Sequence, residues 1–309
     1  MYKTVAILGA GAVGSYIMWG LEQKPSIEYC VIASGDRKKR FEENGFIING
    51  KMYRPVIKTP EESYNVDLLI VAVKYNSLVD SLPDIRKIVG DNTTVISLMN
   101  GVDSEKIIGG VIDDSHIVYS VIKVASERVE NEIKFAPETT IGLIYGEKDG
   151  SMSKRVRELD ELFENTGLHY RASGEILSEI WSKFRLNVPN NQVQAMLGCG
   201  VGAYRDSAHV SFLQKAVLSE VDAIAAAQGI NFDKSDASSS FGSKVADRAR
   251  YSTLQDLDAK RHTEVDMFSG AVIRMGRELG IPTPYNEFVY HMIKALEEKN
   301  DGLFDYDIN

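Results

Sequence analysis

Short apolar runs alternate with amphipathic segments along the first half of the chain. Val5 to Leu8 leads into a glycine-rich turn, and the segment from Ser15 to Gln23 has the periodicity of an amphipathic helix. Further strands are predicted at residues 28–34, 66–74 and 93–101, with helices between them at 35–45 and 77–89. Strands that alternate with helices predict right-handed crossovers and a parallel sheet. Consecutive apolar residues, as from Leu68 to Val73, are typical of strands covered on both faces.

From about Ser173 the pattern changes to long segments with the periodicity of helices. Helices are predicted at residues 176–194, 210–228, 236–249, 264–279 and 286–299. A last strand is predicted at 167–172, so the domain boundary is expected within residues 166–173. The chain of 309 residues is long enough for two domains, since a single hydrophobic core stops growing at about 250–300 residues.

Composition and charge narrow the class of protein. Hydrophobic content of 44% and charged content of 26% are those of an ordinary soluble globular protein. The net charge of −9 argues against nucleic acid as a partner, because such binding depends on clustered Lys and Arg. Cys30 and Cys199 form neither a disulfide framework nor a zinc motif, so no metal is expected. The cytoplasm is the expected compartment, since the chain shows no signal peptide and no apolar run near the ~20 residues of a membrane span.

Gly9, Gly11 and Gly14 form a GxGxxG motif between the first predicted strand and helix. The first glycine permits a sharp turn, the second lets the backbone approach a pyrophosphate, and the third lets the helix lie close to the sheet. Backbone N–H groups at the helix start, including those of Ala12 and Val13, would face the phosphates. A simple tight turn is the alternative, but the strand–turn–helix context favours dinucleotide binding.

The predicted fold is therefore α/β, with an N-terminal Rossmann-type doubly wound parallel sheet and a C-terminal all-α domain. Residues 1–170 would bind the dinucleotide, and residues 171–309 would bind a substrate. The substrate is expected to meet the cofactor in a cleft between the two halves.

The end of the second predicted strand bears on the choice between NAD and NADP. An acidic residue there would hold the 2′-hydroxyl of NAD, but the position is Ala33 or Ser34. Asp36 is followed by four basic residues, and Arg37 among them could meet the 2′-phosphate of NADP. Such a run is more commonly the solvated start of a surface helix, so NADP is favoured while NAD stays open.

Two polar residues follow consecutive predicted strands. Lys74 ends the run "LLIVAVK", and Asn100 follows "VISLM". Because ligands gather at the carboxyl ends of strands in an open α/β sheet, both side chains are expected to border the cofactor. An exposed loop lysine and a simple Asn-Gly turn are the alternatives.

A polar stripe crosses the predicted helix that begins at Ile176. Lys183 and Asn187 lie one turn apart, so they share a face and can serve one small ligand. Asn191 continues the spacing, but Pro189 is expected to kink or end the helix before it. A snorkelling surface lysine is the alternative for Lys183, and the apolar surroundings argue against it.

With these features the chain resembles the ketopantoate reductase family over nearly all of its length. The resemblance rests on the initial GxGxxG, on "AVK", on "MNG", on the helix "EIWSKFRLN", and on "YSTLQDLDAKRHTEVDMFSG" from Tyr251 to Gly270. In this family, S-x-L-Q-D and R-x-T-E-x-D supply a serine and a glutamate to the site. The family's site residues fall here on Lys74, Asn100, Lys183, Asn187, Asn191, Ser252 and Glu264.

The resemblance implies reduction of 2-dehydropantoate (ketopantoate) to D-pantoate by NADPH, a step of pantothenate biosynthesis. Lys183 would be the general acid, because hydride delivery to a carbonyl leaves an alkoxide that an ammonium can stabilise and protonate. Glu264 would keep that ammonium charged and in place. Asn100 and the helix asparagines would bind substrate oxygens, and Ser252 could donate to the carboxylate. A surface glutamate and a helix N-cap are the alternatives for Glu264 and Ser252.

Two departures keep other activities open. Pro189 precedes Asn191, whereas the family often has Asn-Pro after the second helix asparagine, and Ser34 replaces the basic residue that usually ends the second strand. Some relatives oxidise other D-2-hydroxy acids, such as mandelate-type compounds, with NAD. A dinucleotide-binding regulator without turnover is a third hypothesis. The expected partner is a small 2-keto acid rather than nucleic acid or a membrane, and a homodimer stays open.

Overall fold

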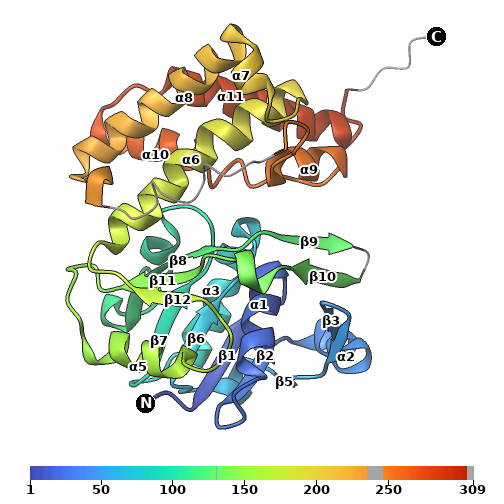
Figure 1. Cartoon of the computed structure of the whole chain (residues 1–309), viewed down its shortest axis with the longest axis vertical. Coiled ribbons are helices and arrows are strands. Elements are labelled where there is room, and N and C mark those ends of the chain that lie inside the picture. The colour runs from blue at the N-terminus through green and yellow to red at the C-terminus, as the bar shows by residue number, and fades with distance from the viewer. Residues whose placement is uncertain (130, 235–245, 305–309) are drawn as a thin grey trace. The chain divides into compact units, whose positions relative to one another are not determined.

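The computed structural model describes residues 1–129, 131–234 and 246–304, and these form two compact units (Figure 1). Unit 1 comprises Met1–Asn100 and Ser104–Leu177, and unit 2 comprises Gly101–Asp103 and the chain from Ser178 onward. The short piece before residue 104 is tied to unit 2 by an ion pair of 2.9 Å between Asp103 and Arg274. The sequence places the boundary at residue 170, whereas the units divide after Leu177, inside a long helix.

Strands and helices alternate in unit 1. Its strands are β1 (Thr4–Leu8), β2 (Glu28–Ile32), β3 (Phe46–Ile48), β4 (Lys51–Tyr53), β5 (Val56–Lys58), β6 (Leu68–Val71), β7 (Thr94–Ser97), β8 (Ile117–Lys123), β9 (Ser126–Val129), β10 (Glu132–Phe135), β11 (Gly142–Gly146) and β12 (Tyr170–Ala172). Its helices are α1 (Ala12–Leu21), α2 (Gly35–Asn44), α3 (Leu78–Ile88), α4 (Ser104–Ile108) and α5 (Lys154–Phe163).

The larger sheet has the strand order β12-β11-β8-β7-β6-β1-β2-β5 (Figure 1). The strands from β8 to β5 pair in parallel, and β11 pairs antiparallel with β8. From β1 the chain adds β2 and β5 on one side and β6 to β8 on the other, so the sheet is doubly wound with β1 at the switch point. The predicted Rossmann-type fold is confirmed.

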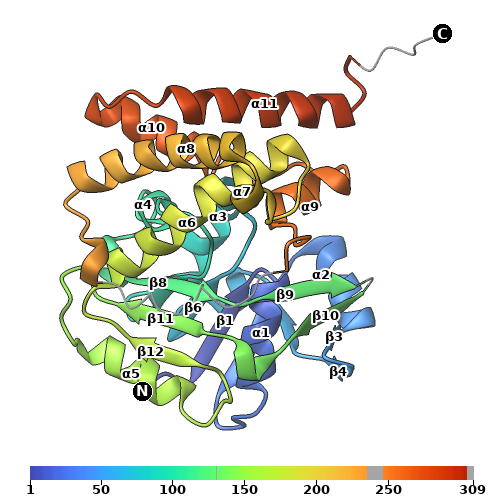
Figure 2. The ribbon, with the colours of Figure 1, turned by 45° about the horizontal axis from the view of Figure 1, so that its top comes forward.

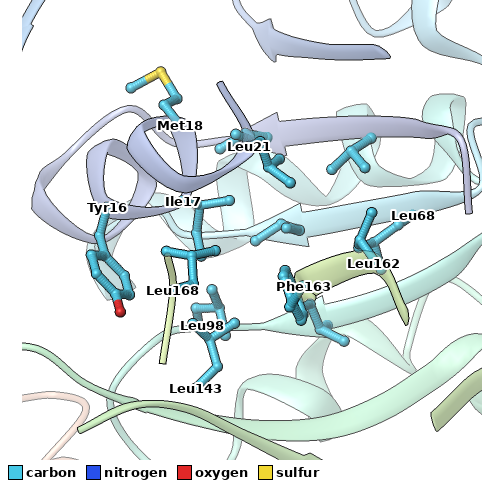
Figure 3. Packing of buried hydrophobic residues seen from close by; sticks show 14 of the residues in the cluster. Tyr16, Ile17, Met18, Leu21, Leu68, Leu98, Leu143, Leu162, Phe163 and Leu168 are labelled. Carbon is cyan, nitrogen blue, oxygen red and sulfur yellow. The ribbon is translucent and has the colours of Figure 1, made fainter. Parts of the chain in front are cut away.

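Both faces of this sheet are covered, which explains the consecutive apolar residues in its strands. Val5 and Ile7 of β1 belong to one core cluster, and the alternate residues Ala6 and Leu8 belong to another. The first cluster includes the buried face of α1, and Figure 3 shows Ile17 of that helix in line with the side chains Leu168, Leu98 and Leu143. The second cluster includes three residues of α3, namely Leu78, Ile85 and Ile88. Successive strand residues point to opposite faces, so both must be apolar.

A second, four-stranded sheet in unit 1 was not predicted. Its order is β4-β3-β10-β9, and β10 pairs in parallel with β3. Phe135 of β10 packs its ring edge-on against Tyr16 and Trp19 of α1, with centroids 5.2 and 5.7 Å apart. Strands of three or four residues are too short to leave a clear period in the sequence.

Unit 2 is helical in its described part. The helix α6 (Ile176–Leu197) enters it from unit 1, and the others are α7 (Ala203–Asp206), α8 (Ala208–Ala227), α9 (Ser252–Asp258), α10 (Ser269–Leu279) and α11 (Pro284–Asn300). The helices α8, α10 and α11 lie side by side (Figure 2). The helix predicted at 236–249 falls mostly outside the described residues, and its last four form a turn. The helix predicted from residue 264 begins only at Ser269.

Candidate functional site

A cleft of about 960 Å³ opens at the carboxyl ends of β1, β2 and β6 in unit 1. Its lining at these strand ends consists of Leu8 to Gly11, Ile32 to Ser34 and Ala72 to Lys74. Because β1 is the switch point of the sheet, this is where an open α/β sheet binds a ligand. The volume is near the upper end of the roughly 300–1,000 Å³ typical of ligand pockets.

The three glycines of the motif have different environments. A Cβ on Gly9, whose φ is +110°, would lie 2.4 Å from the carbonyl oxygen of Ala72, so this turn can approach β6 only with glycine. A Cβ on Gly14 would lie 2.0 Å from the carbonyl oxygen of Gly9, which makes glycine necessary for the close contact of α1 with the turn. A Cβ on Gly11 would meet nothing within 4 Å. Gly11 therefore leaves space in the cleft that the fold itself does not require.

The first turn of α1 presents polar groups that suit a bound phosphate. Gly11 is the N-cap residue and has no side chain to cap the first N–H groups of the helix, which begins with Ala12, Val13 and Gly14. Ser15 lines the cleft, and its buried hydroxyl has no hydrogen-bond partner among the described residues. A buried polar atom without a partner is costly. These groups, together with the glycines, fit a dinucleotide.

Positive charge gathers at the α2 side of the cleft. Ser34 is the exposed N-cap residue of α2, and Arg37, Arg40 and Phe41 line the cleft beyond it. The guanidinium carbons of Arg37 and Arg40 lie 5.3 and 5.7 Å from the ring centroid of Phe41. Burial lowers the pKa of Arg37 and the charge of Arg40 lowers it further, yet an arginine stays protonated at neutral pH. Two neighbouring guanidinium groups on this side of the cleft would attract an anion.

The two residues expected at strand ends lie in different surroundings. Lys74, three residues past β6, is exposed and lines the cleft. Asn100, three residues past β7, is half-buried and is not part of the cleft lining. The structure therefore places Lys74 beside Gly9, Gly11, Ser34 and Arg37 but does not place Asn100 there.

The polar stripe of α6 lies on one continuous helix. Lys183 and Asn187 are half-buried, and Asn191 is 5% exposed. The helix does not end at Pro189 but continues to Leu197, so Asn191 follows Asn187 by one helical turn. Of the two effects expected of Pro189, a kink or an end of the helix, the end does not occur, because Val188, Val193 and other neighbours are fully buried and packing outweighs one missing backbone bond.

Asn191 links the stripe to α9. Its Oδ1 accepts a hydrogen bond from the hydroxyl of Ser252 at 3.2 Å, and its side-chain nitrogen donates to the carbonyl of Asn187 at 3.1 Å. Ser252 is exposed and is the first residue of α9, whose N-cap residue is Tyr251. Ser252 therefore does not serve as a helix cap, and the structure brings Asn187, Asn191 and Ser252 together.

Gln194 supports this arrangement and was missed in the sequence. Its side chain is fully buried, with Nε2 donating to the carbonyl of Ala249 at 3.0 Å and Oε1 accepting from the N–H of Tyr251 at 2.6 Å. These two bonds fix the backbone directly before Ser252. The density of amides in "NNQVQ" was the available signal, but it does not reveal a partner 55 residues away.

Glu264 is half-buried in unit 2 and lies in a turn rather than in a helix. The turn precedes α10, and the N–H groups of Met267 and Phe268 donate to the carbonyl of Glu264 at 3.0 and 3.3 Å. The expected position near a helix start is therefore corrected to a turn that ends at that helix. The flanking residues Val265 and Met267 are fully buried, which anchors the segment.

A doubly wound sheet with a glycine-lined cleft at its switch point defines the class of dinucleotide-binding α/β proteins. Comparison with known proteins makes the assignment specific. The family model "Ketopantoate reductase PanE/ApbA" matches residues 5–145, and "Ketopantoate reductase PanE/ApbA C terminal" matches residues 175–297. The chain belongs to the ketopantoate reductase family, and the resemblance seen in the sequence is confirmed.

Relatives and solved structures match along nearly the whole chain. The 2-dehydropantoate 2-reductase of Pyrococcus horikoshii is 28% identical over 310 residues, which cover 96% of this chain and 99% of the relative. The structure of D-mandelate dehydrogenase with NADH and anilino(oxo)acetate has a TM-score of 0.82 at 23% identity and covers 96% of this chain and 99% of its own. The dimeric ketopantoate reductase of Staphylococcus aureus has a TM-score of 0.75 at 21% identity, with the same coverage. Among the described residues, no helix has the length and apolar character needed to cross a membrane.

Proposed function

We propose that this chain catalyses the NADPH-dependent reduction of 2-dehydropantoate to D-pantoate. The name 2-dehydropantoate 2-reductase belongs to relatives that align with 95% or more of this chain, including that of Pyrococcus horikoshii. The observation that carries the proposal is the polar face of α6, where Lys183 and Asn187 lie one turn apart and Asn191 is hydrogen-bonded to Ser252.

Lys183 acts as the general acid in this proposal. When bound, NADPH would supply the hydride for the keto carbon of the substrate. Negative charge then develops on the carbonyl oxygen, and the ammonium of Lys183 stabilises and protonates it. Because Lys183 is half-buried, solvent screens this interaction less than it would on an exposed helix face. The carboxylate of Glu264 keeps the ammonium in its charged form.

The hydrogen bonds of Asn191 indicate that it has a different role from Asn187 and Ser252. Asn191 already uses its side-chain oxygen for Ser252 and its nitrogen for Asn187. We assign it the role of holding Ser252, whose hydroxyl oxygen keeps lone pairs that can accept from a substrate hydroxyl. Asn187, which is half-buried, and Asn100 bind substrate oxygens in this assignment.

The cations of α2 support NADP as the cofactor. Arg37 and Arg40 line the same cleft as the glycine turn, and both lie on the ring of Phe41. A 2′-phosphate would form charge-assisted hydrogen bonds with guanidinium groups and with the hydroxyl of Ser34. The 2′-hydroxyl of NAD carries no charge and would not form an ion pair with these guanidinium groups. Gly9, Gly11, Ala12, Val13, Gly14 and Lys74 complete the proposed cofactor site.

A D-2-hydroxy acid dehydrogenase that uses NAD is the second candidate. It is favoured by the fold of D-mandelate dehydrogenase, which was solved with NADH, and by Ser34 at the end of β2 in place of a basic residue. A homodimer is a further proposal, because a ketopantoate reductase of the same fold is dimeric. Light scattering of the purified protein measures the mass that decides this point.

A panel of 2-keto acids with NADPH and NADH tests the proposed function. We expect the largest kcat/KM for ketopantoate with NADPH. A larger value for an aromatic keto acid such as phenylglyoxylate with NADH would favour the second candidate. Tight cofactor binding without oxidation of either cofactor would favour a regulator without turnover.

A further inference from the structure

The turn that carries Glu264 needs support from outside itself. Within it, the N–H of Val265 donates to the hydroxyl of Thr263 at 3.2 Å, and the N–H of Met267 donates to the carbonyl of Glu264 at 3.0 Å. These bonds fix the local shape of the turn, but they do not fix its place in unit 2. That place depends on the elements packed against it, and α11 supplies charged side chains to the turn.

Glu297 of α11 reaches the turn directly before Glu264. It is 3% exposed, and its Oε1 accepts two hydrogen bonds from Thr263. One comes from the backbone N–H at 2.7 Å and the other from the hydroxyl at 2.6 Å. The residue next to Glu264 is thereby attached to α11 through both its backbone and its side chain.

Two further side chains of α11 reach the turn on the other side of Glu264. The hydroxyl of Tyr290 donates to Oδ1 of Asp266 at 2.8 Å, and the ammonium of Lys294 donates to Oδ2 at 3.3 Å. Lys294 also donates to Oε2 of Glu297 at 3.0 Å. Spacings of four and three residues put these donors and the carboxylate on one helix face. Glu264 is therefore flanked by two attachments to the same helix.

The charges at this contact compensate one another. A carboxylate as buried as Glu297 is costly unless it is paired and hydrogen-bonded, and Lys294 supplies the counter-charge. Burial alone would lower the pKa of Lys294, but its bonds to Glu297 and Asp266 raise it above the ordinary value, so the ammonium stays charged. The ring of His262 also faces Glu297, with Nδ1 at 3.8 Å from Oε2, but it is exposed and bonded to Asp301 through Nε2 at 3.0 Å.

We propose that Glu297 and Lys294 are positioning residues for Glu264: they hold the turn at residues 263–266 on α11 and so set the direction of the Glu264 carboxylate. This inference rests on the proposed function, in which Glu264 keeps Lys183 charged. A displaced turn would leave every reacting group present but misplaced, and a shift of about 1 Å can cost roughly 10²-fold in rate.

The first test compares two changes at Glu297. Glu297→Ala removes both bonds to Thr263, whereas Glu297→Gln keeps an oxygen that can accept them. For keto acid reduction with NADPH, we expect Glu297→Ala to lower kcat roughly 10- to 100-fold with KM for NADPH unchanged. The alkaline limb of its kcat–pH profile should move to lower pH, because Lys183 loses the carboxylate that favours its charged form.

Glu297→Gln should recover most of the wild-type rate and profile. Lys299→Ala, an exposed change on the same helix, is the matched control and should behave as wild type. A folded Glu297→Ala enzyme with the wild-type pH profile would overturn the inference.

A milder variant covers the case in which Glu297→Ala does not fold. Thr263→Val combined with Tyr290→Phe removes the hydroxyl bonds to Glu297 and Asp266 on the two sides of Glu264. It also removes the bond that the Thr263 hydroxyl accepts from the N–H of Val265, and it leaves the Glu297–Lys294 pair intact. We expect a smaller fall in kcat and a shift of the alkaline limb in the same direction. Wild-type kcat and profile in this folded double variant would contradict the inference.

Hydrogen exchange separates this inference from the proposed function. The amides of Thr263 and Val265 are hydrogen-bonded, so we expect slow exchange in the wild type and in Lys299→Ala. Exchange should accelerate at Val265 in Glu297→Ala and at residue 263 in the double variant, where each of these amides keeps its own acceptor, whether or not the protein turns over a keto acid. If the wild type reduces no keto acid, the proposed function fails, and unchanged exchange at residues 263–266 would by itself overturn the positioning role.

Discussion

The hydroxyl of Ser252 donates a hydrogen bond to Oδ1 of Asn191, 3.2 Å away, although 61 residues separate them in the sequence. Asn191 in turn donates to the carbonyl of Asn187 at 3.1 Å. Ser252 is thus attached to the helix face that also carries Lys183. Gln194 fixes the backbone on the N-terminal side of Ser252, so its position does not depend on Asn191 alone.

Removal of the Ser252 hydroxyl should weaken substrate binding rather than the fold. The residue is exposed, and we expect Ser252→Ala to raise KM for the keto acid about 3- to 10-fold, as expected for one neutral hydrogen bond, with a small change in kcat. Steady-state kinetics measure this. Ser219→Ala, which removes an exposed hydroxyl from α8, is the control. Equal KM values in the two variants would exclude Ser252 from the substrate site.

Two glycines of the motif should respond differently to alanine. Gly14→Ala places a Cβ 2.0 Å from a backbone oxygen, so we expect it to lower the free energy of unfolding by roughly 1–3 kcal/mol. Gly11→Ala meets no protein atom within 4 Å and should leave that free energy within about 0.5 kcal/mol of wild type. It should nevertheless raise the Kd for NADPH, because the methyl group occupies space needed by the pyrophosphate. Thermal unfolding and cofactor titration measure both effects, and unaltered NADPH binding in Gly11→Ala would contradict this assignment.

The charge of Arg37 should distinguish the two cofactors. We expect Arg37→Ala to raise the Kd for NADPH about 10- to 100-fold, the loss expected for hydrogen bonds to a charged group, and to change the Kd for NADH little. Fluorescence titration with each cofactor measures this. Lys39→Ala is the matched control, because Lys39 lies on the same helix but not in the cleft lining. Equal losses for NADPH and NADH would show that Arg37 does not bind a 2′-phosphate.

The ion pair of Glu147 and Arg155 should make stability depend on acid pH. Burial alone would raise the pKa of Glu147, but its bonds to Arg155 and Ser153 outweigh this and hold the pKa below its ordinary value. A depressed carboxylate pKa stabilises the fold above the unfolded pKa, and the stabilisation is lost as the pH falls through the folded value. We expect Glu147→Gln to cost about 1.5–3 kcal/mol at neutral pH and progressively less on acidification. Thermal unfolding from about pH 7 to about pH 3 measures this, and a difference that stays constant would contradict it.

The sheet could be predicted because the sequence pattern of each strand depends on residues next to one another in the chain. Strands covered on both faces must be apolar at consecutive positions, as Leu68 to Val71 are, and such runs stand out against the amphipathic helices between them. The shared helix face of Lys183 and Asn187 could be predicted for the same reason, since residues four positions apart lie on one face of a helix. That these residues act on a substrate stays a prediction.

Features that depend on distant partners could not be predicted. Pro189 favours a kink or an end of the helix, but the helix continues to Leu197 because residues on both sides of the proline, such as Val188 and Val193, are buried. The turn at Glu264 was mistaken for a helix start, because the apolar residues Val265 and Phe268 have helical spacing although they are buried beside a turn. The attachment of Thr263 to Glu297 spans 34 residues and leaves no sequence pattern at either end.

Lys183 carries the central claim, and the turnover number of Lys183→Ala tests it most directly. Ketopantoate reduction by NADPH should fall roughly 10²- to 10⁴-fold in kcat, the contribution of a general acid, while the Kd for NADPH stays that of the wild type. A folded Lys183→Ala enzyme that keeps the wild-type kcat would contradict the account.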